Sequence, residues 1–299
     1  MVAGHAWSRY HAAIMAVGPV VVLGIGALMG VFTTVVVVAR RRWRRQGAAR
    51  LATMLAVRSG PSQRDGRPAA SDDVPPIVRR YLDRTIPRGM PPVNVVRVGQ
   101  AGEFRLGNRW KPFRATQVFR IEPPAFCWDA DIRMAPGLHV LVRDAYDAGV
   151  GSTRGALEGL ITIVNAAGGP EIAAAALQRF LAEAIWFPMA LRPGPRVAWT
   201  PVDDRRARVT LTDGATRAVI EFRFDEQGEL TGIYTPARFR EEKGRFVPMP
   251  WGARVLAWAS HDDVRVASAV EVGWYEAAGF APFYRGRVTS LRYGRDGGA

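Results

Sequence analysis

Cysteine and histidine are scarce in this chain of 299 residues, which contains one cysteine, Cys127, and four histidines. A single thiol excludes an intrachain disulfide, and the chain has no cysteine and histidine cluster at the spacing of zinc ligands. The histidines give no support to a Ser-His-Asp catalytic triad. We therefore expect neither a resident metal nor another cofactor.

Acidic residues are few in the N-terminal third. Residues 1–92 contain four aspartates, no glutamate and 14 arginines, a net charge of +10, whereas residues 93–299 carry only +4. A globular nucleic-acid-binding protein would present its positive charge as a face of the folded domain. The distribution therefore argues against nucleic acid as a partner and indicates contact with a membrane surface.

Charged residues are absent from residues 12–39, a run of 28 residues that contains VGPVVVLGIGALMGVFTTVVVV. About 20 apolar residues suffice to cross a bilayer. A cleaved signal peptide would have a shorter apolar core and no large cationic cluster after it. We interpret residues 1–11 as a short N-terminal tail and residues 12–39 as a single transmembrane helix, with the lipid bilayer as its partner.

Arginines follow this run directly, in the sequence RRRWRRQ. They outnumber the single Arg9 on the other side, so the positive-inside rule predicts a single-pass protein of the cell (inner) membrane with its soluble domain on the cytoplasmic side. The residues of this cluster are expected at the membrane surface, where the arginines could hold anionic lipid head groups. They are Arg40, Arg41, Arg42, Trp43, Arg44 and Arg45.

Two glycines in the apolar run, Gly26 and Gly30, form a G-x-x-x-G pattern. Such a pattern lets two membrane helices approach closely, although glycine is also simply frequent in membrane helices. A homodimer through these two glycines is one interpretation.

The segment after the apolar run, residues 40–75, begins with the basic cluster and ends in SGPSQRDGRPAASDDVPP. Its small, polar and proline-containing second part is typical of a flexible linker. The next stretch, PPIVRRYLDRTIP, predicts a short helix that begins near Pro76 and ends before Pro87. We expect the folded domain to occupy residues 76–295, followed by a tail of residues 296–299.

The domain alternates apolar and polar residues in successive short runs from Val93 onward, which is typical of β-strands. Asp213-Gly214, between ARVTLT and ATRAVIEFRF, is the clearest hairpin signal. About ten strands with few helices between them must form a mostly antiparallel sheet, because parallel strands need crossover segments of a dozen or more residues.

Two helical stretches are expected within this sheet, a long one over residues 170–190 and a shorter one around residues 156–164. The apolar stripe of the long helix is broad, as expected for a helix that lies in a concavity. The predicted fold class is α+β: an N-terminal transmembrane helix, then a large curved antiparallel sheet, or open half-barrel. A helical lid, about residues 156–190, covers its concave face.

The lid stretch LQRFLAEAIWFP places Arg179 four residues before Glu183. Arginine before glutamate is the weaker order for a pair on a helix surface, worth only tenths of a kcal/mol. Two explanations stay open: the pair joins a polar network with the sheet, or Glu183 is a buried acid with a raised pKa that performs catalysis. By sequence proximity, its candidate catalytic partners are Asp144 and Asp147.

Seven of the nine tryptophans lie in the domain. Large aromatic side chains usually fill a core, but in an incompletely closed sheet some of them can line an apolar cavity. The residues expected to contact a ligand are Trp110, Trp128, Tyr146, Arg179, Glu183, Trp186 and Phe187.

Several segments, in order, resemble an uncharacterised bacterial family known only as a domain of unknown function. They are RWKPFRATQVF, PPAFCWDADIRMAPG, RDAYDAGVG, LQRFLAEAIWFPMAL, WTPVDD, FDEQGEL and YRGRVTSLRYG. The resemblance covers roughly Pro76 to Tyr293, and its most specific motif is Arg-x-Leu-x-Glu-x-x-Trp-Phe-Pro. The chain departs from the pattern near Met249–Trp258. The resemblance implies no established activity.

The predicted layout is similar to that of lipoprotein carriers, which are open β half-barrels with a helical lid. Those carriers work outside the cytoplasm, which conflicts with the orientation given by the arginines. The leading hypothesis is a membrane-anchored, non-enzymatic domain that binds a lipophilic or amphipathic small molecule. The alternatives are a hydrolase-like enzyme that uses Glu183 with Asp144 or Asp147, and a structural or assembly protein.

Overall fold

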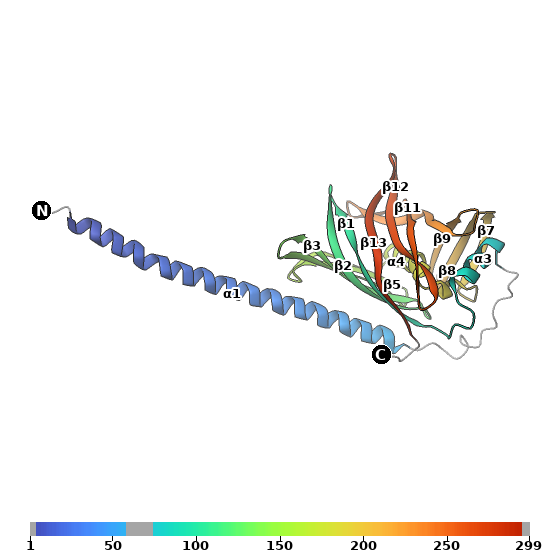
Figure 1. Ribbon diagram of the computed structural model, residues 1–299, viewed down its shortest axis with the longest axis horizontal. Coiled ribbons are helices and arrows are strands. Elements are labelled where there is room, and N and C mark those ends of the chain that lie inside the picture. Colours follow the sequence, from blue (N-terminus) through green and yellow to red (C-terminus); the bar gives the residue numbers. More distant parts are fainter. Residues whose placement is uncertain (1–3, 58–73, 295–299) are drawn as a thin grey trace.

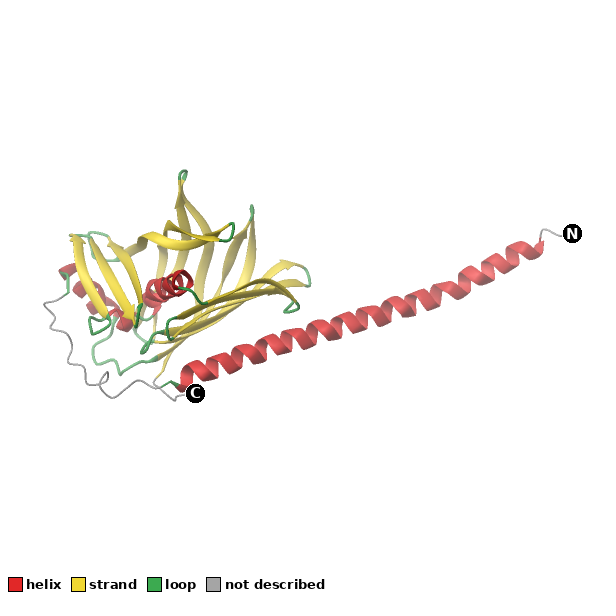
Figure 2. Cartoon of the chain, turned by 180° about the vertical axis from the view of Figure 1, so that it is seen from behind, coloured by secondary structure: helices red, strands yellow, loops and turns green. Residues whose placement is uncertain are grey.

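Thirteen β-strands form one sheet that curves around a helix (Figures 1 and 2). The computed structural model describes residues 4–57 and 74–294, and the side chains of residues 26–57 and 74–294. The strands are β1 (Val95–Leu106), β2 (Arg109–Arg120), β3 (Ala125–Ala135), β4 (Leu138–Asp147), β5 (Val150–Leu157), β6 (Ile161–Ala167), β7 (Val197–Asp203), β8 (Arg206–Asp213), β9 (Thr216–Phe224), β10 (Leu230–Glu242), β11 (Arg245–His261), β12 (Val264–Glu276) and β13 (Gly279–Gly294).

The first and last strands of the sheet meet in its middle. The strand order is β6-β5-β4-β3-β2-β1-β13-β12-β11-β10-β9-β8-β7, and β1 pairs with both β2 and β13 in antiparallel register. The chain therefore runs outward from β1 to β6, crosses the concave face, and returns from β7 to β13. The two edges, β6 and β7, stay unpaired with each other, so the prediction of an open, curved antiparallel sheet is confirmed.

A helix makes that crossing between the two edges. Helix α4 (Pro170–Glu183) is followed by two 3-10 turns, η2 (Ala184–Trp186) and η3 (Pro188–Leu191). The lid helix is thus shorter than the predicted 170–190. Proline lacks a backbone N–H and restricts the residue before it, and Phe187, with φ of −141°, is already outside the helical region before Pro188.

The shorter helix predicted around residues 156–164 is wrong, and so is the start of the lid at residue 156. These residues form the end of β5, a tight turn and the start of β6, with Leu157 paired to Ile161. Glu158 and Gly159 both have positive φ, 53° and 73°, which a hairpin turn accepts and a helix does not. In contrast, the predicted hairpin at Asp213-Gly214 is confirmed, because β8 ends at Asp213 and pairs with β9.

The main hydrophobic core lies between α4 and the concave face. Leu177, Phe180 and Leu181 of α4 are at most 2% exposed, and Phe180 packs against Phe119 of β2 with ring centroids 6.0 Å apart. Each such side chain contributes roughly 1.5–3 kcal/mol when it is fully buried. Helix α3 (Pro76–Thr85), which matches the predicted short helix, closes one end of this core by packing Tyr81 against β9.

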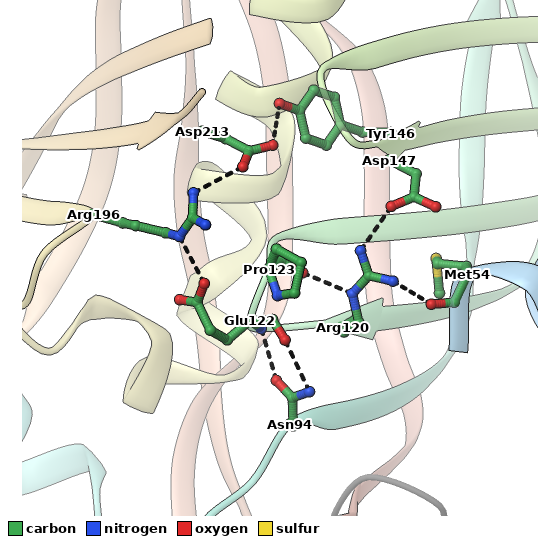
Figure 3. A network of polar contacts seen from close by, with 9 residues as sticks. All are labelled: Met54, Asn94, Arg120, Glu122, Pro123, Tyr146, Asp147, Arg196 and Asp213. Carbon is green, nitrogen blue, oxygen red and sulfur yellow. Dashed lines mark hydrogen bonds and ion pairs between the residues drawn. The ribbon is translucent and has the colours of Figure 1, made fainter. Parts of the chain in front are cut away.

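Side chains, not strand pairing, join the two halves of the sheet at one end (Figure 3). Arg196, just before β7, forms ion pairs with Glu122 after β2 at 2.6 Å and with Asp213 at the β8–β9 turn at 2.9 Å. The hydroxyl of Tyr146 on β4 donates to Asp213 over 2.8 Å. This seam links the ends of β2 and β4 in one half of the sheet to the start of β7 and the β8–β9 turn in the other.

The N-terminal helix, α1 (Gly4–Ala56), projects from the outer face of the sheet (Figure 1). Within the residues whose side chains are described, no helix combines the length and apolar character that a membrane crossing requires. Residues 12–25 of the predicted transmembrane helix lie outside that part of the chain. Of the predicted basic juxtamembrane segment and flexible linker over residues 40–75, residues 40–56 continue α1, and residues 58–73 lie outside the described residues.

The C-terminal part of α1 docks on the outer face of β2 to β5. Its contact stripe repeats every three or four residues, as one side of a helix does: Ala39, Trp43, Gly47, Leu51 and Met54. Gly47 allows this close approach because a Cβ at that position would collide with the Arg143 guanidinium. At the end of the stripe, Arg120 of β2 donates to the Met54 carbonyl and forms an ion pair with Asp147 at 2.7 Å (Figure 3).

Trp43 is the main anchor of this helix on the domain. It is 5% exposed, and the guanidinium groups of Arg143 and Arg154 lie 4.7 and 5.3 Å from its ring centroid. Nearby, Arg40 forms an ion pair with Glu158 of the β5–β6 turn at 2.5 Å. The prediction that Trp43 and Arg40 face a membrane surface is therefore corrected: cation–π and ionic contacts with the sheet engage both side chains. The other four arginines of the cluster are exposed.

Replacement of this anchor should release α1 from the sheet. A Trp43→Ala substitution removes a buried aromatic side chain, a loss of about 3–5 kcal/mol. Since 1.4 kcal/mol is about a factor of ten, amide exchange in residues 39–56 should accelerate at least about 100-fold in hydrogen–deuterium exchange mass spectrometry. Arg42→Ala, at an exposed position of the same helix, is the control. Unchanged protection of residues 39–56 in Trp43→Ala would contradict the docking.

Candidate functional site

A cavity of about 190 Å³ lies between the end of α4 and the concave face of the sheet. Its wall is apolar apart from Tyr284 and four charged side chains, which come from α4, β4 and β10. The lining residues are Phe104, Asp144, Arg179, Ala182, Glu183, Ile185, Trp186, Ile233, Arg238, Trp251, Ala253, Val270, Val272, Phe283 and Tyr284. Such an apolar hollow with a few convergent polar groups is the usual form of a small-molecule site.

A polar chain runs along one side of this cavity. Arg179 donates to Asp144 of β4 and, over 2.9 Å, to Oε1 of Glu183. The other carboxylate oxygen of Glu183 accepts a hydrogen bond from Gln117 Nε2 at 2.7 Å. The Arg179 guanidinium also lies 4.6 Å from the ring centroid of Trp128. The lid is therefore held on the sheet by charge-assisted hydrogen bonds and by a cation–π contact.

The chain continues into the sheet through two buried amides. Gln117 Oε1 accepts from Gln100 Nε2 at 2.9 Å, and Gln100 Oε1 accepts from the indole N–H of Trp128 at 2.9 Å. The Tyr284 hydroxyl donates to the same Gln100 oxygen over 3.3 Å. Because the amides are satisfied on both sides, they fix the positions of the carboxylates at the cavity.

Burial and ion pairing act in opposite directions on this cluster. Burial raises the pKa of the Glu183 carboxyl, and the nearby Arg179 charge together with hydrogen bonds from Arg179 and Gln117 offsets only part of that effect. Burial lowers the pKa of Arg179, but Glu183 and Asp144 more than compensate, so its pKa is raised overall. The arginine stays charged, whereas the buried glutamate binds a proton more readily than an exposed one.

Arg238 is the fourth charged residue of the cavity, and a β-bulge places it there. Thr235 pairs with Trp251 but Arg238 pairs with Met249, so β10 contains one extra residue between these two positions. An extra residue reverses the alternation of faces, which turns Arg238 to the same side as Thr235. Pro236 lies within this bulge, where a missing N–H is tolerated.

The guanidinium of Arg238 stacks on Trp251, 4.8 Å from the ring centroid, and donates to the Ala175 carbonyl of α4. Within the described residues, it forms no ion pair with a carboxylate. Burial, followed by the charge of Arg179, lowers the pKa of Arg238 to about 10. A cation that is buried against another cation without a contacting carboxylate is costly to maintain.

Two further polar atoms at this cavity have no hydrogen-bond partner in the described part of the chain: Asp144 Oδ1 and Trp251 Nε1. Buried polar groups are nearly always satisfied, so unpartnered ones at a cavity are candidates for contact with a ligand or water.

The structure brings together several of the predicted site residues. Asp144, Arg179, Glu183 and Trp186 all line the cavity, and Trp186 is fixed there by its indole N–H, which donates to the Ala267 carbonyl at 3.0 Å. Trp128 lies directly behind Arg179 in the polar chain and does not line the cavity. The polar network of the first explanation is present, and the raised pKa of Glu183 on which the second depends is present as well.

The other predicted residues lie elsewhere. Trp110 is on the outer face of β2, three positions from the inward-facing Phe113, with Arg285 over its ring at 4.4 Å. Asp147 is also on the outer side, paired with Arg120, so it cannot act with Glu183. Tyr146 belongs to the seam, and Phe187 fills the core between Phe119 and Phe180.

Sequence reasoning missed Arg238, Trp251 and the apolar wall formed by β11, β12 and β13. The proline in GIYTPARFRE was a usable signal, since proline within a strand indicates a bulge. The wall residues carry no such signal. The alternation of apolar and polar residues along a strand shows that it has two faces, but it does not show which other strands its apolar face meets.

Larger hollows of about 340, 510 and 720 Å³ lie at the surface of the described residues. The one of about 720 Å³ is lined by residues of β1 to β4 and β11 to β13, with Arg114, Arg133, Arg285 and Arg287 among them. The one of about 340 Å³ lies beside α1. All three are more open to solvent than the cavity beneath α4. No group of three potential metal ligands occurs among the side chains that the structure describes.

The fold and the site define an open antiparallel half-barrel with a helix and a small mixed apolar and charged cavity in its concavity. Residues 72–293 match the profile of a family of unknown function, DUF6920, and the chain belongs to that family. The predicted membership in an uncharacterised family is thus confirmed. No curated protein matches the chain.

Two solved structures are similar to this chain in part. A DUF1329 family protein from Desulfovibrio piger ATCC 29098 is 13% identical, with a TM-score of 0.38, over 75% of this chain and 91% of that one. A candidate outer membrane lipoprotein-sorting protein domain from Vibrio parahaemolyticus is 10% identical, with a TM-score of 0.38, over 72% of this chain and 91% of that one.

The raised pKa of Glu183 predicts a pH dependence of stability. Between the pKa of an unfolded glutamate, about 4.3, and the higher folded value, the folded state holds a proton that the unfolded state has released. This contribution is therefore fully present below the unfolded pKa and is lost as the pH rises through the folded pKa. In urea unfolding, the free energy of unfolding of the natural protein should fall relative to that of Glu183→Gln between pH 4 and pH 8.

The control for this comparison is Glu226→Gln, whose side chain is 74% exposed in a turn and distant from the cavity. If the difference in the free energy of unfolding between the natural protein and Glu183→Gln stays constant over the whole pH range, burial does not raise the pKa of Glu183.

Proposed function

We propose that this protein binds a lipophilic or amphipathic small molecule, without transforming it, in the cavity between α4 and the sheet. The observation that carries the proposal is the composition of the wall: apolar side chains from five strands and from α4 and η2 surround a space that one charged cluster borders. An apolar wall supplies affinity, and a few fixed polar groups orient the ligand.

The volume of the cavity limits the size of the part that is buried. An engineered apolar cavity of about 150 Å³ accommodates benzene, so about 190 Å³ suits one ring or one segment of a single chain. A pair of acyl chains would need the lid to move away from the sheet.

The contacts of the carboxylates support binding over catalysis. Both oxygens of Glu183 already accept hydrogen bonds, from Arg179 and Gln117, and one oxygen of Asp144 is held by Arg179. A general acid or base must reach the proton that it transfers. Glu183 would have to break its existing bonds to do so.

Filling the cavity should abolish binding without unfolding the domain. We expect native mass spectrometry of the gently purified full chain to show a co-purifying apolar molecule. Ala253→Phe, in the cavity wall on β11, should reduce its occupancy at least about tenfold by taking up the space. Ala198→Phe adds the same volume at an exposed position of β7 and should leave the occupancy unchanged. An empty natural protein, or equal occupancy in both variants, would contradict the proposal.

Membrane anchoring through residues 12–39, with the domain on the cytoplasmic side, is part of the same proposal. The 28 uncharged residues and the arginine excess after them support it. The exposure of Arg41, Arg42, Arg44 and Arg45 leaves them free to contact anionic lipid head groups. Gly26 and Gly30, with no atom within 4 Å of a Cβ built at either, support helix pairing in a homodimer.

The anchoring has a direct test. The full chain should remain in the membrane pellet after alkaline carbonate extraction, whereas a chain that lacks residues 1–39 should not. A green fluorescent protein fused to the C-terminus should fluoresce, and an alkaline phosphatase fused there should be inactive. Active alkaline phosphatase would place the domain on the other side of the membrane.

A further inference from the structure

We infer that the ligand carries an acidic group, and that Arg238 and Trp251 bind this group at the charged end of the cavity. The inference rests on the proposed function, because it names the chemistry of the molecule that the cavity holds. The expected ligand is an organic anion with a single apolar chain or a single ring.

Arg238 differs in its contacts from three other arginines of the domain. Arg120, Arg143 and Arg179 each form an ion pair with an aspartate within the domain. Arg238 has no such partner among the described residues, although it has five N–H donors, and its protein hydrogen bond is to a backbone carbonyl. A guanidinium with free donors in an apolar wall is suited to a carboxylate, which can accept two parallel hydrogen bonds.

Trp251 provides a second, independent observation. It is 5% exposed, it lines the same cavity, and its indole nitrogen has no hydrogen-bond partner in the described part of the chain. An indole N–H can only donate, so it requires an acceptor. The cation–π contact with Arg238 holds the two donor groups together.

The balance of unsatisfied groups favours an anion over a cation. The guanidinium of Arg238 and the indole of Trp251 are donors, whereas Asp144 Oδ1 is a single unpartnered acceptor at the cavity. Asp144 is also already neutralised by Arg179. A basic ligand would place its charge between two arginines, while an acidic one would provide the counter-ion that Arg238 lacks.

The test uses three probes with the same ten-carbon chain: decanoate, 1-decanol and decylammonium. Binding to the full chain in nanodiscs of zwitterionic lipid is measured by equilibrium dialysis at pH 7.5, with empty nanodiscs as the reference. We expect decanoate to bind at least tenfold more tightly than 1-decanol, and decylammonium more weakly than either. Arg238→Met should remove the preference for decanoate and change the affinity for 1-decanol less than threefold. Arg238→Lys, which keeps the charge, should restore part of the preference.

Two further variants keep the result interpretable. Arg254→Met removes an exposed arginine that stacks on Phe280 outside the cavity, and it should behave as the natural protein. Trp251→Phe removes the N–H but keeps a ring, and it should weaken decanoate binding about threefold or more. If Arg238→Met does not fold, the comparison of the natural protein with Trp251→Phe and Arg238→Lys decides.

The outcomes separate the two proposals. Equal binding of decanoate and 1-decanol, or tighter binding of decylammonium, overturns the acidic group while the lipophilic cavity stands. Loss of both decanoate and 1-decanol binding in a folded Arg238→Met protein also overturns the inference. Arg238 would then maintain the structure of the cavity and would not bind an acidic group. Failure of all three probes to bind overturns the inference together with the proposed function.

Discussion

The burial of one apolar helix in the concavity of the sheet is the constraint on which the rest of the structure depends. A sheet of thirteen antiparallel strands has two edges with unpaired backbone groups and an apolar inner face. The inner face must be covered by another element to be removed from water. Helix α4 connects the two edge strands and covers the inner face between them. Without Leu177, Phe180 and Leu181, the inner face would lose its apolar cover, and the halves would be joined by the β1–β13 pairing and the seam around Arg196.

The same helix explains why charged residues occur at the site. Arg179 and Glu183 lie on the part of α4 that meets β2 and β4, so each requires a partner within the protein. The sheet provides Asp144, Gln117 and, through the glutamine relay, Trp128. A polar chain of this kind specifies the position of the lid more strictly than apolar contacts, which tolerate sliding. The cavity begins where the polar chain ends and the apolar packing is incomplete.

Much of the fold could be predicted from the sequence, because its signals are local. Alternating runs and the Asp213-Gly214 turn indicated antiparallel hairpins, and the apolar stripe after Gly169 indicated the lid helix. The failures have physical causes. A short apolar run such as residues 156–164 suits either a helix or a strand, and only its turn geometry decides. The docking of residues 40–56 depends on arginines about one hundred residues later in the chain.

The candidate site was predictable only in part, for the same reason. Arg179 and Glu183 stood out because charged residues interrupted an apolar stripe. Trp110 was misplaced because a strand shows two faces, and the sequence does not say which one is inward. Arg238 faces the cavity because β10 contains one extra residue. The bulge is defined by the pairing of β10 with β11, which the sequence of β10 alone does not show.

The docking of α1 also has a mechanical consequence. Helix α1 runs from Gly4 to Ala56 and is clamped on the sheet through residues 39–54, so the part before residue 39 forms an arm of roughly 50 Å at 1.5 Å per residue. The clamp grips β3 and β4 from outside, and the inward-facing residues of these strands include Trp128 and Asp144. A sideways force on the free end of the arm would therefore act as a torque on the backbone that bears one wall of the cavity.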